Sequence, residues 1–350
     1  MTGILFHGPE IFDSGWAARL MRAFPRARCM LAGTMSRTAL FDSGLKGVET
    51  PGALPSKCVQ LLASDCRAVL LATRSKTPRS GLIFGRLVAG RIETVVSVVQ
   101  AECSGPVYAA QSGKCPARIS SMLRELGFSP VSAPEACIEL WHENGALCRR
   151  MTTAEKGDFV LVNGIVVGKA NGGEVVLTAR GRAITEIRGV SVKPHGLEKL
   201  ERLGGVDLAA AKLASTARLR PNAVPARLVK SRGRGVVFID HAGMHVYALA
   251  AKADGAVTVG DDTTAVAGDI LRRFGVPVIG IVDGDGDGLH AGGGLAPGSE
   301  VFTVKADDIA GLKVLKGVFS GKQRSGAVFV EIKEAILNIL EGDICSRKVY

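Results

Sequence analysis

The strongest chemical signal in the sequence is a group of three aspartates at alternate positions. Asp283, Asp285 and Asp287 follow an apolar, largely β-branched run, and only glycine separates them. Carboxylates this close repel one another, but a cation among them removes the repulsion, and oxygen ligands favour a hard ion such as Mg²⁺ or Mn²⁺. The glycines allow the backbone to turn and a ligand to approach. The stretch 278–294 therefore predicts a divalent-metal site.

Other interpretations of these aspartates remain open. The same spacing opens an EF-hand calcium loop, but Gly294 stands where that loop needs a bidentate glutamate, and a strand precedes the aspartates in place of a helix. A transition-metal site is a second alternative, since His241 and His245 lie four residues apart and His290 follows the acidic run. A third alternative is a structural Asp-Gly turn without metal.

Hydroxyl and basic side chains follow the predicted strands of the N-terminal part. In open α/β sheets, ligands collect beyond the carboxyl ends of the strands, and this composition suits an anion such as a phosphate or carboxylate. The predicted ligand residues are Thr34, Ser36, Arg37, Thr73, Arg74 and Lys76. Polar loops also occur at the edge of any soluble sheet. Neither G-x-G-x-x-G after the first strand nor G-x-x-x-x-G-K-[ST] occurs, so the usual nucleotide-binding motifs are absent.

The net charge of +11 is concentrated in the middle of the chain. No acidic residue occurs between Asp207 and Asp240. The basic residues of that interval are Lys212, Arg218, Arg220, Arg227, Lys230, Arg232 and Arg234. Such a run attracts polyanions, so we expect the 212–234 segment to contact nucleic acid. A solvated basic linker that balances the acidic C-terminal part is the alternative.

The pattern of apolar runs predicts a multidomain α/β protein that positions these groups. Residues 1–148 alternate strands with helices, which indicates a Rossmann-like domain with a doubly wound, mostly parallel sheet. Residues 149–214 predict a small β-rich module with short helices, and residues 215–235 a basic linker. Residues 236–350 return to α/β alternation and form the predicted metal-binding domain.

Within the C-terminal domain, the strand 278–282 leads directly into the aspartates, and the strand 236–240 ends at Asp240. A further strand is expected over 327–330. A final helix over 333–340 carries apolar residues near helical spacing and should cover one face of the sheet.

Composition indicates a globular protein without membrane or disulfide signals. Hydrophobic residues make up 47% of the chain and charged residues 22%. No apolar run approaches the roughly 18 residues that span a bilayer, and the N-terminus lacks a signal peptide, so we expect a cytoplasmic protein. The eight cysteines contain no C-x-x-C pair, which favours reduced, buried thiols. A metal cluster held by distant cysteines remains open.

The stretch 234–317 resembles the toprim domain of topoisomerases, primases and some nucleases. That family places a glutamate after its first strand and an Asp-x-Asp pair after its third, and together they bind Mg²⁺. The type II topoisomerase version extends to Asp-x-Asp-x-Asp-Gly, which Asp283, Asp285, Asp287 and Gly288 match. The resemblance implies a toprim-like fold and a bound divalent ion. The shorter Asp240 stands in place of the glutamate, so Asp240 is the predicted catalytic residue, with its part in proton transfer left open.

The complete layout also resembles an uncharacterised conserved family found mainly in methanogenic archaea, which implies a cytoplasmic archaeal setting and no known activity. Aspartates at 254 and 261–262 resemble, more weakly, those of thiamine pyrophosphokinase-like enzymes. The leading hypothesis is divalent-metal-dependent phosphoryl-transfer or phosphodiester chemistry on a nucleic acid or nucleotide. The alternative is a non-enzymatic metal- or small-anion-binding regulator or assembly factor in archaeal metabolism.

Overall fold

The chain folds into two compact units, Met1–Ala217 and Arg218–Tyr350. The computed structural model describes residues 1–135, 139–216, 220, 225–229, 233–240, 246–250, 252–286 and 294–350. Both units contain a parallel-rich sheet flanked by helices, so the predicted mixed α/β fold is confirmed.

The N-terminal part of the first unit forms, in its described residues, a seven-stranded sheet in the order β3-β2-β1-β4-β5-β6-β7. These strands are β1 (Thr2–His7), β2 (Arg28–Ala32), β3 (Val48–Glu49), β4 (Ala68–Thr73), β5 (Ser97–Glu102), β6 (Val107–Ser112) and β7 (Ser129–Pro130). The strands from β3 to β5 run parallel, and β6 is antiparallel to β5. The chain builds β2 and β3 on one side of β1 and then crosses to β4 on the other. This is the doubly wound, mostly parallel arrangement that the sequence predicted.

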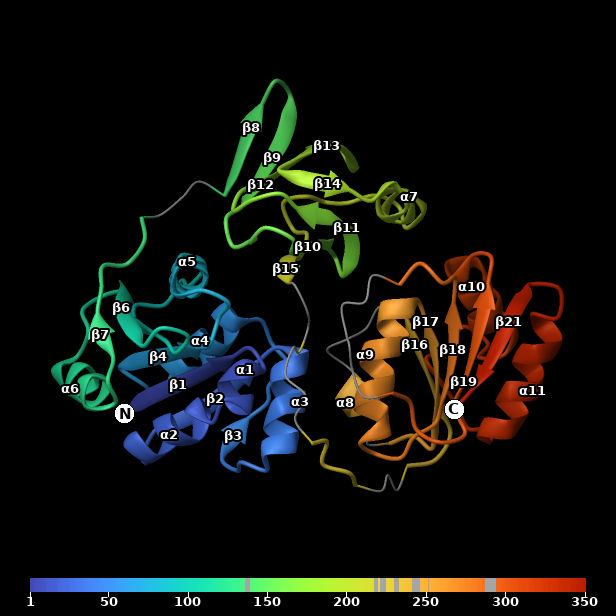
Figure 1. Ribbon diagram of the computed structural model, residues 1–350, viewed down its shortest axis with the longest axis horizontal. Coiled ribbons are helices and arrows are strands. Elements are labelled where there is room, and N and C mark those ends of the chain that lie inside the picture. The colour runs from blue at the N-terminus through green and yellow to red at the C-terminus, as the bar shows by residue number, and fades with distance from the viewer. Residues whose placement is uncertain are drawn as a thin grey trace. The chain divides into compact units, whose positions relative to one another are not determined.

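Helices cover both faces of this sheet (Figure 1). They are α1 (Glu10–Asp13), α2 (Trp16–Ala23), α3 (Thr34–Ser43), α4 (Pro55–Ala63), α5 (Pro78–Ala89) and α6 (Ala117–Glu125). Successive strand residues point to opposite faces, so Phe6 packs with α1, α2, α3 and α6, whereas Leu5 packs with α4 and α5. Both side chains are fully buried, as expected for a central strand of a parallel sheet.

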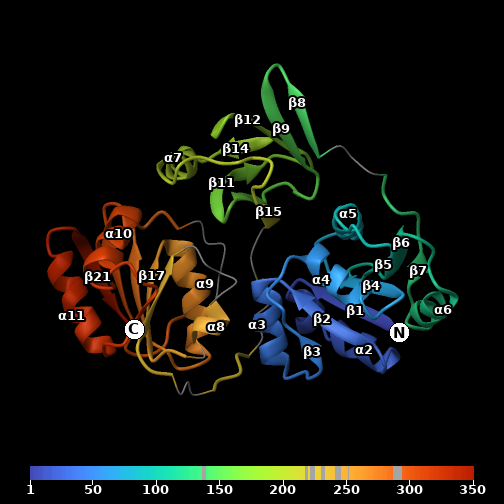
Figure 2. The same ribbon diagram turned by 180° about the vertical axis from the view of Figure 1, so that it is seen from behind.

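The middle of the first unit is a β-rich module, as predicted. Its described strands form two antiparallel sheets, in the orders β14-β11-β10-β15 and β13-β12-β9-β8. The elements are β8 (Leu140–Glu143), β9 (Ala146–Met151), β10 (Phe159–Val162), β11 (Ile165–Ala170), β12 (Val175–Arg180), β13 (Ala183–Arg188), β14 (Val190–Val192), α7 (Pro194–Arg202) and β15 (Leu213–Thr216). Figure 2 shows the same module from behind. Its core of aliphatic side chains is separate from that of the N-terminal sheet.

The second unit has a six-stranded sheet in the order β20-β16-β17-β18-β19-β21, counted over its described residues. The four strands from β16 to β19 are parallel, and both edge strands are antiparallel to them. The elements are β16 (Val236–Asp240), α8 (Val246–Ala250), β17 (Gly255–Val259), α9 (Asp261–Arg272), β18 (Val278–Val282), β19 (Glu300–Val304), α10 (Asp307–Gly317), β20 (Arg324–Ser325), α11 (Phe329–Ile339) and β21 (Ile344–Val349). One core lies with α8 and α9, and the other lies with α10 and α11 (Figure 1).

The strand expected over 327–330 is wrong, because the helix α11 already begins at Phe329. The backbone N–H of Val328 donates a hydrogen bond to the Glu331 carboxylate (3.2 Å), which satisfies a donor at the start of the helix. This capping hydrogen bond stabilises the start of the helix, although β-branched residues such as Val328 and Val330 favour strands.

Two glycines bring helices of the second unit close to the sheet. A Cβ on Gly280 of β18 would lie 2.7 Å from Thr264 Cγ2 of α9. On the other face, a Cβ on Gly311 of α10 would lie 2.7 Å from Val259 Cγ1 of β17. Because neither glycine has a side chain, α9 and α10 pack tightly on opposite faces of the sheet. Their first residues consequently lie near the carboxyl end of β18.

Candidate metal site

Three aspartates meet at the carboxyl edge of the second sheet. Asp261 follows β17, Asp283 follows β18 directly, and Asp307 follows β19. Each offers one carboxylate oxygen, and these three oxygens lie within 4.8 Å of one another. Asp307 is fully buried, whereas Asp261 and Asp283 are partly exposed. The arrangement therefore presents three oxygen ligands from three neighbouring parallel strands, with access to solvent on one side.

Helix starts hold two of the three carboxylates. Asp261 is the first residue of α9 and Asp307 the first residue of α10. Gly260, with φ of 97°, lets the chain leave β17 and turn into α9, a conformation that residues with a side chain rarely adopt. The partial positive charge at a helix start stabilises a nearby carboxylate. This offsets part of the repulsion that the group would otherwise suffer.

The loop after β18 is tied to Asp261. The N–H of Gly284 donates to Asp261 Oδ2 (3.0 Å), and the N–H of Asp285 donates to Asp283 Oδ1 (3.2 Å). A Cβ on Gly286 would lie 3.1 Å from the Asp261 Cβ, so the loop backbone passes close to that side chain. Asp261 therefore fixes the backbone that carries Asp283 and Asp285.

The environment of Asp283 favours its protonated form. Burial, together with the neighbouring charges of Asp307 and Asp285, raises the pKa of its carboxyl to about 6. A cation between the carboxylates would reverse this preference, because it would stabilise the ionised form. The oxygen-only donor set fits Mg²⁺ or Mn²⁺.

The structure places Asp283 and Asp285 at the end of the third parallel strand of the sheet, where the sequence predicted them. Asp287 lies outside the described residues, as do His241, His245 and His290. Asp240 ends β16, and β17 lies between β16 and β18. Within the described part of the chain, the group of three oxygens does not include Asp240.

The sequence pointed to Asp261 only through a weak resemblance and did not assign Asp261 or Asp307 to the metal site. Each is the first residue of a helix, a position where an acidic residue is common for reasons of helix stability alone. The signal that could have found them is their place after a buried strand, the same criterion that selected Asp283. Parallel neighbouring strands end at one edge, so residues that follow them lie along that edge.

The residues predicted to bind an anion lie along the carboxyl edge of the N-terminal sheet. Thr34, Ser36 and Arg37 begin α3 after β2, and Thr73 ends β4. The Ser36 hydroxyl accepts a hydrogen bond from the N–H of Gly8 (2.9 Å), which links the loops after β2 and β1. The two loops are therefore neighbours.

Two of the predicted anion ligands have structural partners. Thr73 Oγ1 donates to Glu102 Oε2 (2.6 Å), and Lys76 forms an ion pair with Asp158 of the β-rich module. Glu102 is fully buried and also accepts the N–H groups of Ser75 (2.9 Å) and Ser104 (2.8 Å). Glu102 thus fixes the loop that carries Arg74 and Lys76.

The predicted nucleic-acid segment is described only in part. Arg220 is buried, with 8% of its surface exposed, so its side chain is not on a solvated basic face. The N–H of Val229 donates to the carbonyl of Arg273 at the end of α9 (2.7 Å). The 225–229 stretch is therefore attached to the second unit. Lys230, Arg232 and Arg218 lie outside the described residues.

The cysteines that the structure describes form no disulfide, in agreement with the prediction of free thiols. Cys29, Cys58, Cys66, Cys103 and Cys148 are buried, whereas Cys345 is exposed. Among the described helices, none has the length and apolar character that crossing a bilayer requires.

Comparison with known proteins identifies relatives along nearly the whole chain. Residues 4–322 match the family described as "Uncharacterized protein conserved in archaea (DUF2117)". An uncharacterized protein of Methanocaldococcus jannaschii, MJ0065, is 32% identical over 361 residues, which cover 98% of each chain. No solved structure matches the chain significantly.

Proposed function

The chain belongs to this family of proteins conserved in archaea, and from that premise we propose that it carries out divalent-metal-dependent phosphoryl-transfer or phosphodiester chemistry on a nucleic acid or nucleotide. The single observation that carries the proposal is the convergence of three carboxylate oxygens within 4.8 Å at the carboxyl edge of the second sheet. Oxygen-only ligands in this number suit Mg²⁺ or Mn²⁺ and leave further coordination positions for water and substrate.

Asp261, Asp283 and Asp307 are the proposed metal ligands. Asp283 is partly exposed, and Asp307 is buried. A divalent ion at this place would stabilise the negative charge that develops on phosphate oxygens during phosphoryl transfer. The N–H of Asp285 donates a hydrogen bond to the Asp283 carboxylate, which keeps the two residues close together. This position suits a contact between Asp285 and the proposed ion through a metal-bound water.

Asp240 is the proposed additional carboxylate. It ends β16, which is two strand positions from β18, or about 10 Å at the usual strand spacing. That separation supports an indirect role, through water or substrate, in preference to direct ligation beside Asp283. The order of Asp240 on the first parallel strand and Asp283 after the third supports the toprim resemblance.

A hydrolysis assay tests the proposal. The purified full-length protein is incubated with Mn²⁺ or Mg²⁺ and with a single-stranded oligonucleotide, a plasmid and a chromogenic phosphodiester. We expect metal-dependent cleavage that Asp283→Asn abolishes. The matched control is Asp254→Asn, which changes an exposed carboxylate just before β17, at the opposite edge of the same sheet.

Two results would decide against the proposal. Cleavage that is unchanged in Asp283→Asn would show that the acidic site does not catalyse it. Tight metal binding without turnover of any substrate would favour the alternative, a non-enzymatic metal-binding regulator or assembly factor.

A further inference from the structure

The N-terminal sheet has a second place where functional groups converge, and it is independent of the acidic site. Strand β1 lies between β2 and β4, and the chain leaves β1 toward one side before it crosses to the other. At the carboxyl edge of the sheet, the loop after β1 therefore leads toward β2, and the loop after β4 leads away from it toward β5. In doubly wound sheets, such a switch point is where ligands bind.

His7 is the last residue of β1 and is held in one orientation at this edge. Its Nδ1 lies 3.2 Å from the carbonyl oxygen of Ala32, so Nδ1 carries the proton and donates it. Its ring stacks on Phe84 of α5, with centroids 4.4 Å apart and an interplanar angle of 15°. Burial lowers the pKa of His7 to about 4, and the charge of Lys212 lowers it as well. The imidazole is thus neutral, and its Nε2 has a lone pair without a partner among the described residues.

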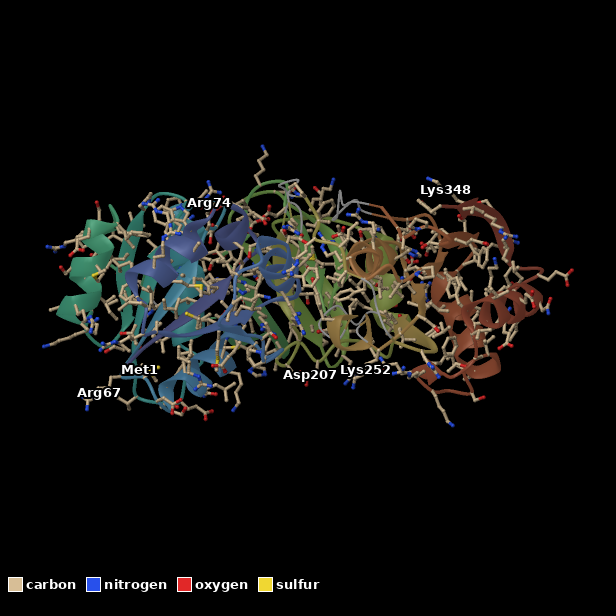
Figure 3. The ribbon with its side chains drawn as sticks, turned by 90° about the horizontal axis from the view of Figure 1, so that it is seen from below. Met1, Arg67, Arg74, Asp207, Lys252 and Lys348 are labelled. Atoms are coloured by element: carbon tan, nitrogen blue, oxygen red, sulfur yellow. The ribbon has the colours of Figure 1, made fainter. Side chains whose placement is uncertain are left out.

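Arg74 lies at the same carboxyl edge of the sheet. Thr73 is the register partner of His7, so the backbone of Arg74 follows at the adjacent position along the edge, next to Gly8. Arg74 forms no hydrogen bond or ion pair with any described residue. Figure 3 shows Arg74 at the side of the unit opposite to Met1 and Arg67, which precede β1 and β4. Arg74 is therefore at the carboxyl edge, where the switch point is.

Lys212 reaches the same edge from the β-rich module. Its backbone is fixed by two hydrogen bonds with Asn163, one from Lys212 N–H to Asn163 Oδ1 and one from Asn163 N–H to the Lys212 carbonyl, both 2.9 Å. Its side chain is exposed, yet its charge acts on His7. No ion pair with a described carboxylate neutralises it. Lys212 therefore adds an uncompensated positive charge near the imidazole.

The edge also offers a hydrogen-bond acceptor, His7 Nε2, which can accept from a hydroxyl group. A ligand that complements this edge carries an oxyanion for the cations and a hydroxyl for the imidazole.

We propose that the switch point between β1 and β4 binds a phosphorylated, hydroxyl-bearing small molecule, with Arg74 and Lys212 on the phosphate and His7 Nε2 accepting from a hydroxyl. Glu102 is a positioning residue of this site, because it holds the loop that carries Arg74. Thr73 and Lys76, which the sequence predicted as ligands, contact Glu102 and Asp158 respectively.

The test is a titration of the full-length protein followed by the NMR signal of the His7 Cε1–H. This signal is identified by its cross-peaks to the Phe84 ring, on which the imidazole is stacked. The probes are ribose 5-phosphate, ribose and inorganic phosphate. We expect a saturable shift with ribose 5-phosphate and much weaker binding of the other two, since each supplies only half of the contacts.

Substitutions test whether Arg74 and Lys212 bind the phosphate. Arg74→Gln and Lys212→Gln should each weaken ribose 5-phosphate binding by about tenfold, the loss of one charge-assisted contact. Arg79→Gln is the matched control, because Arg79 is an exposed arginine in the first turn of α5 and forms no hydrogen bond or ion pair with the described residues. Its affinity should be unchanged.

Three outcomes would overturn the proposal. They are the absence of a saturable His7 shift, equal binding of ribose 5-phosphate and inorganic phosphate, and unchanged affinity in both Arg74→Gln and Lys212→Gln. The acidic site of the second unit takes no part in this test, so its outcome is independent of the proposed metal chemistry.

Discussion

At the scale of single residues, the most informative side chain is Asp283. Burial and the charges of Asp307 and Asp285 raise the pKa of its carboxyl from 3.8 to about 6. Asp261, in contrast, accepts a hydrogen bond from the Gly284 N–H. The carboxylates therefore differ in their roles. Asp261 fixes the loop backbone, whereas ionisation of Asp283 is made unfavourable by burial and by the neighbouring negative charges.

The pKa of Asp283 predicts a pH dependence of stability in the metal-free protein. The raised value means that the folded state holds the proton more tightly than the unfolded chain. The resulting stability is present below about pH 4 and is lost as the pH rises through about 6. In the presence of EDTA, Asp283→Asn should therefore be more stable than the wild type above pH 6. After allowance for screening of a half-exposed group, the difference should be on the order of 1 kcal/mol.

Urea unfolding at several pH values measures this difference. The difference should shrink toward zero as the pH falls below 3.8, where the wild-type carboxyl becomes protonated in both states. Asp254→Asn should show no such pH-dependent gain. A wild type that is more stable than Asp283→Asn at neutral pH without metal would contradict the assigned environment.

Glu102 predicts a large effect on stability in the first unit. The change Glu102→Ala leaves the Ser75 and Ser104 N–H groups and the Thr73 hydroxyl without their acceptor. We expect a loss of about 2–4 kcal/mol in the free energy of unfolding, because buried donors without partners are costly. The measurement is chemical denaturation, with Glu93→Ala, an exposed glutamate before β5, as the control. Equal stability of the two variants would disprove the role of Glu102.

At the scale of elements, the sequence predicted the strand that carries Asp283 but not the complete site. The run 278–282 is apolar and β-branched and ends abruptly in Asp283, so its boundary could be predicted from composition alone. Asp261 and Asp307 begin helices, and sequence alone gives no distance between two helix starts on opposite faces of a sheet. That distance depends on how closely α9 and α10 pack, which the glycines at 280 and 311 determine.

Substitution of Gly311 tests this packing. A Cβ at this position would lie 2.7 and 2.8 Å from the two methyl groups of Val259, so α10 must move away from β17. Gly311→Ala should lower the free energy of unfolding by about 1–3 kcal/mol, despite the higher helix propensity of alanine. It should also weaken metal binding, because Asp307 begins the same helix. Calorimetric titration with Mn²⁺ and urea unfolding measure the two effects.

The control for this substitution is Gly342→Ala, where a Cβ would meet no atom within 4 Å. That variant should resemble the wild type in both measurements. A Gly311→Ala protein with wild-type stability and metal affinity would show that close packing of α10 does not position Asp307.

At the scale of the whole molecule, the family match over residues 4–322 spans both units, and the Methanocaldococcus jannaschii relative covers 98% of the chain. The matched range includes the residues that form the N-terminal sheet, the β-rich module and the strands β16 to β19. The net charge of the chain is +11. Its basic run, 212–234, spans the boundary between the two units in the sequence. Nucleic acid remains the predicted partner of that run.

If nucleic acid is the partner, the binding affinity should depend on the salt concentration. Binding of double-stranded DNA by the full-length protein should weaken linearly on a plot of log affinity against log salt. Arg234→Gln should reduce the slope by about 0.9, the contribution of one phosphate contact. Arg67→Gln, in the loop before β4 of the first unit, should leave the slope unchanged. Fluorescence anisotropy at several salt concentrations measures it, and a slope near zero would rule out a polyanion partner for the run.

We propose that Asp261, Asp283 and Asp307 hold one divalent ion. Anomalous diffraction from crystals of the full-length protein grown with Mn²⁺ measures this most directly. We expect one anomalous peak between these three side chains, with metal–oxygen distances of roughly 2.0–2.3 Å. That peak should be absent in Asp283→Asn crystals and present in Asp254→Asn crystals. A fully occupied Mn²⁺ elsewhere, with no density among the three aspartates at saturating metal, would show that these aspartates do not form the metal site.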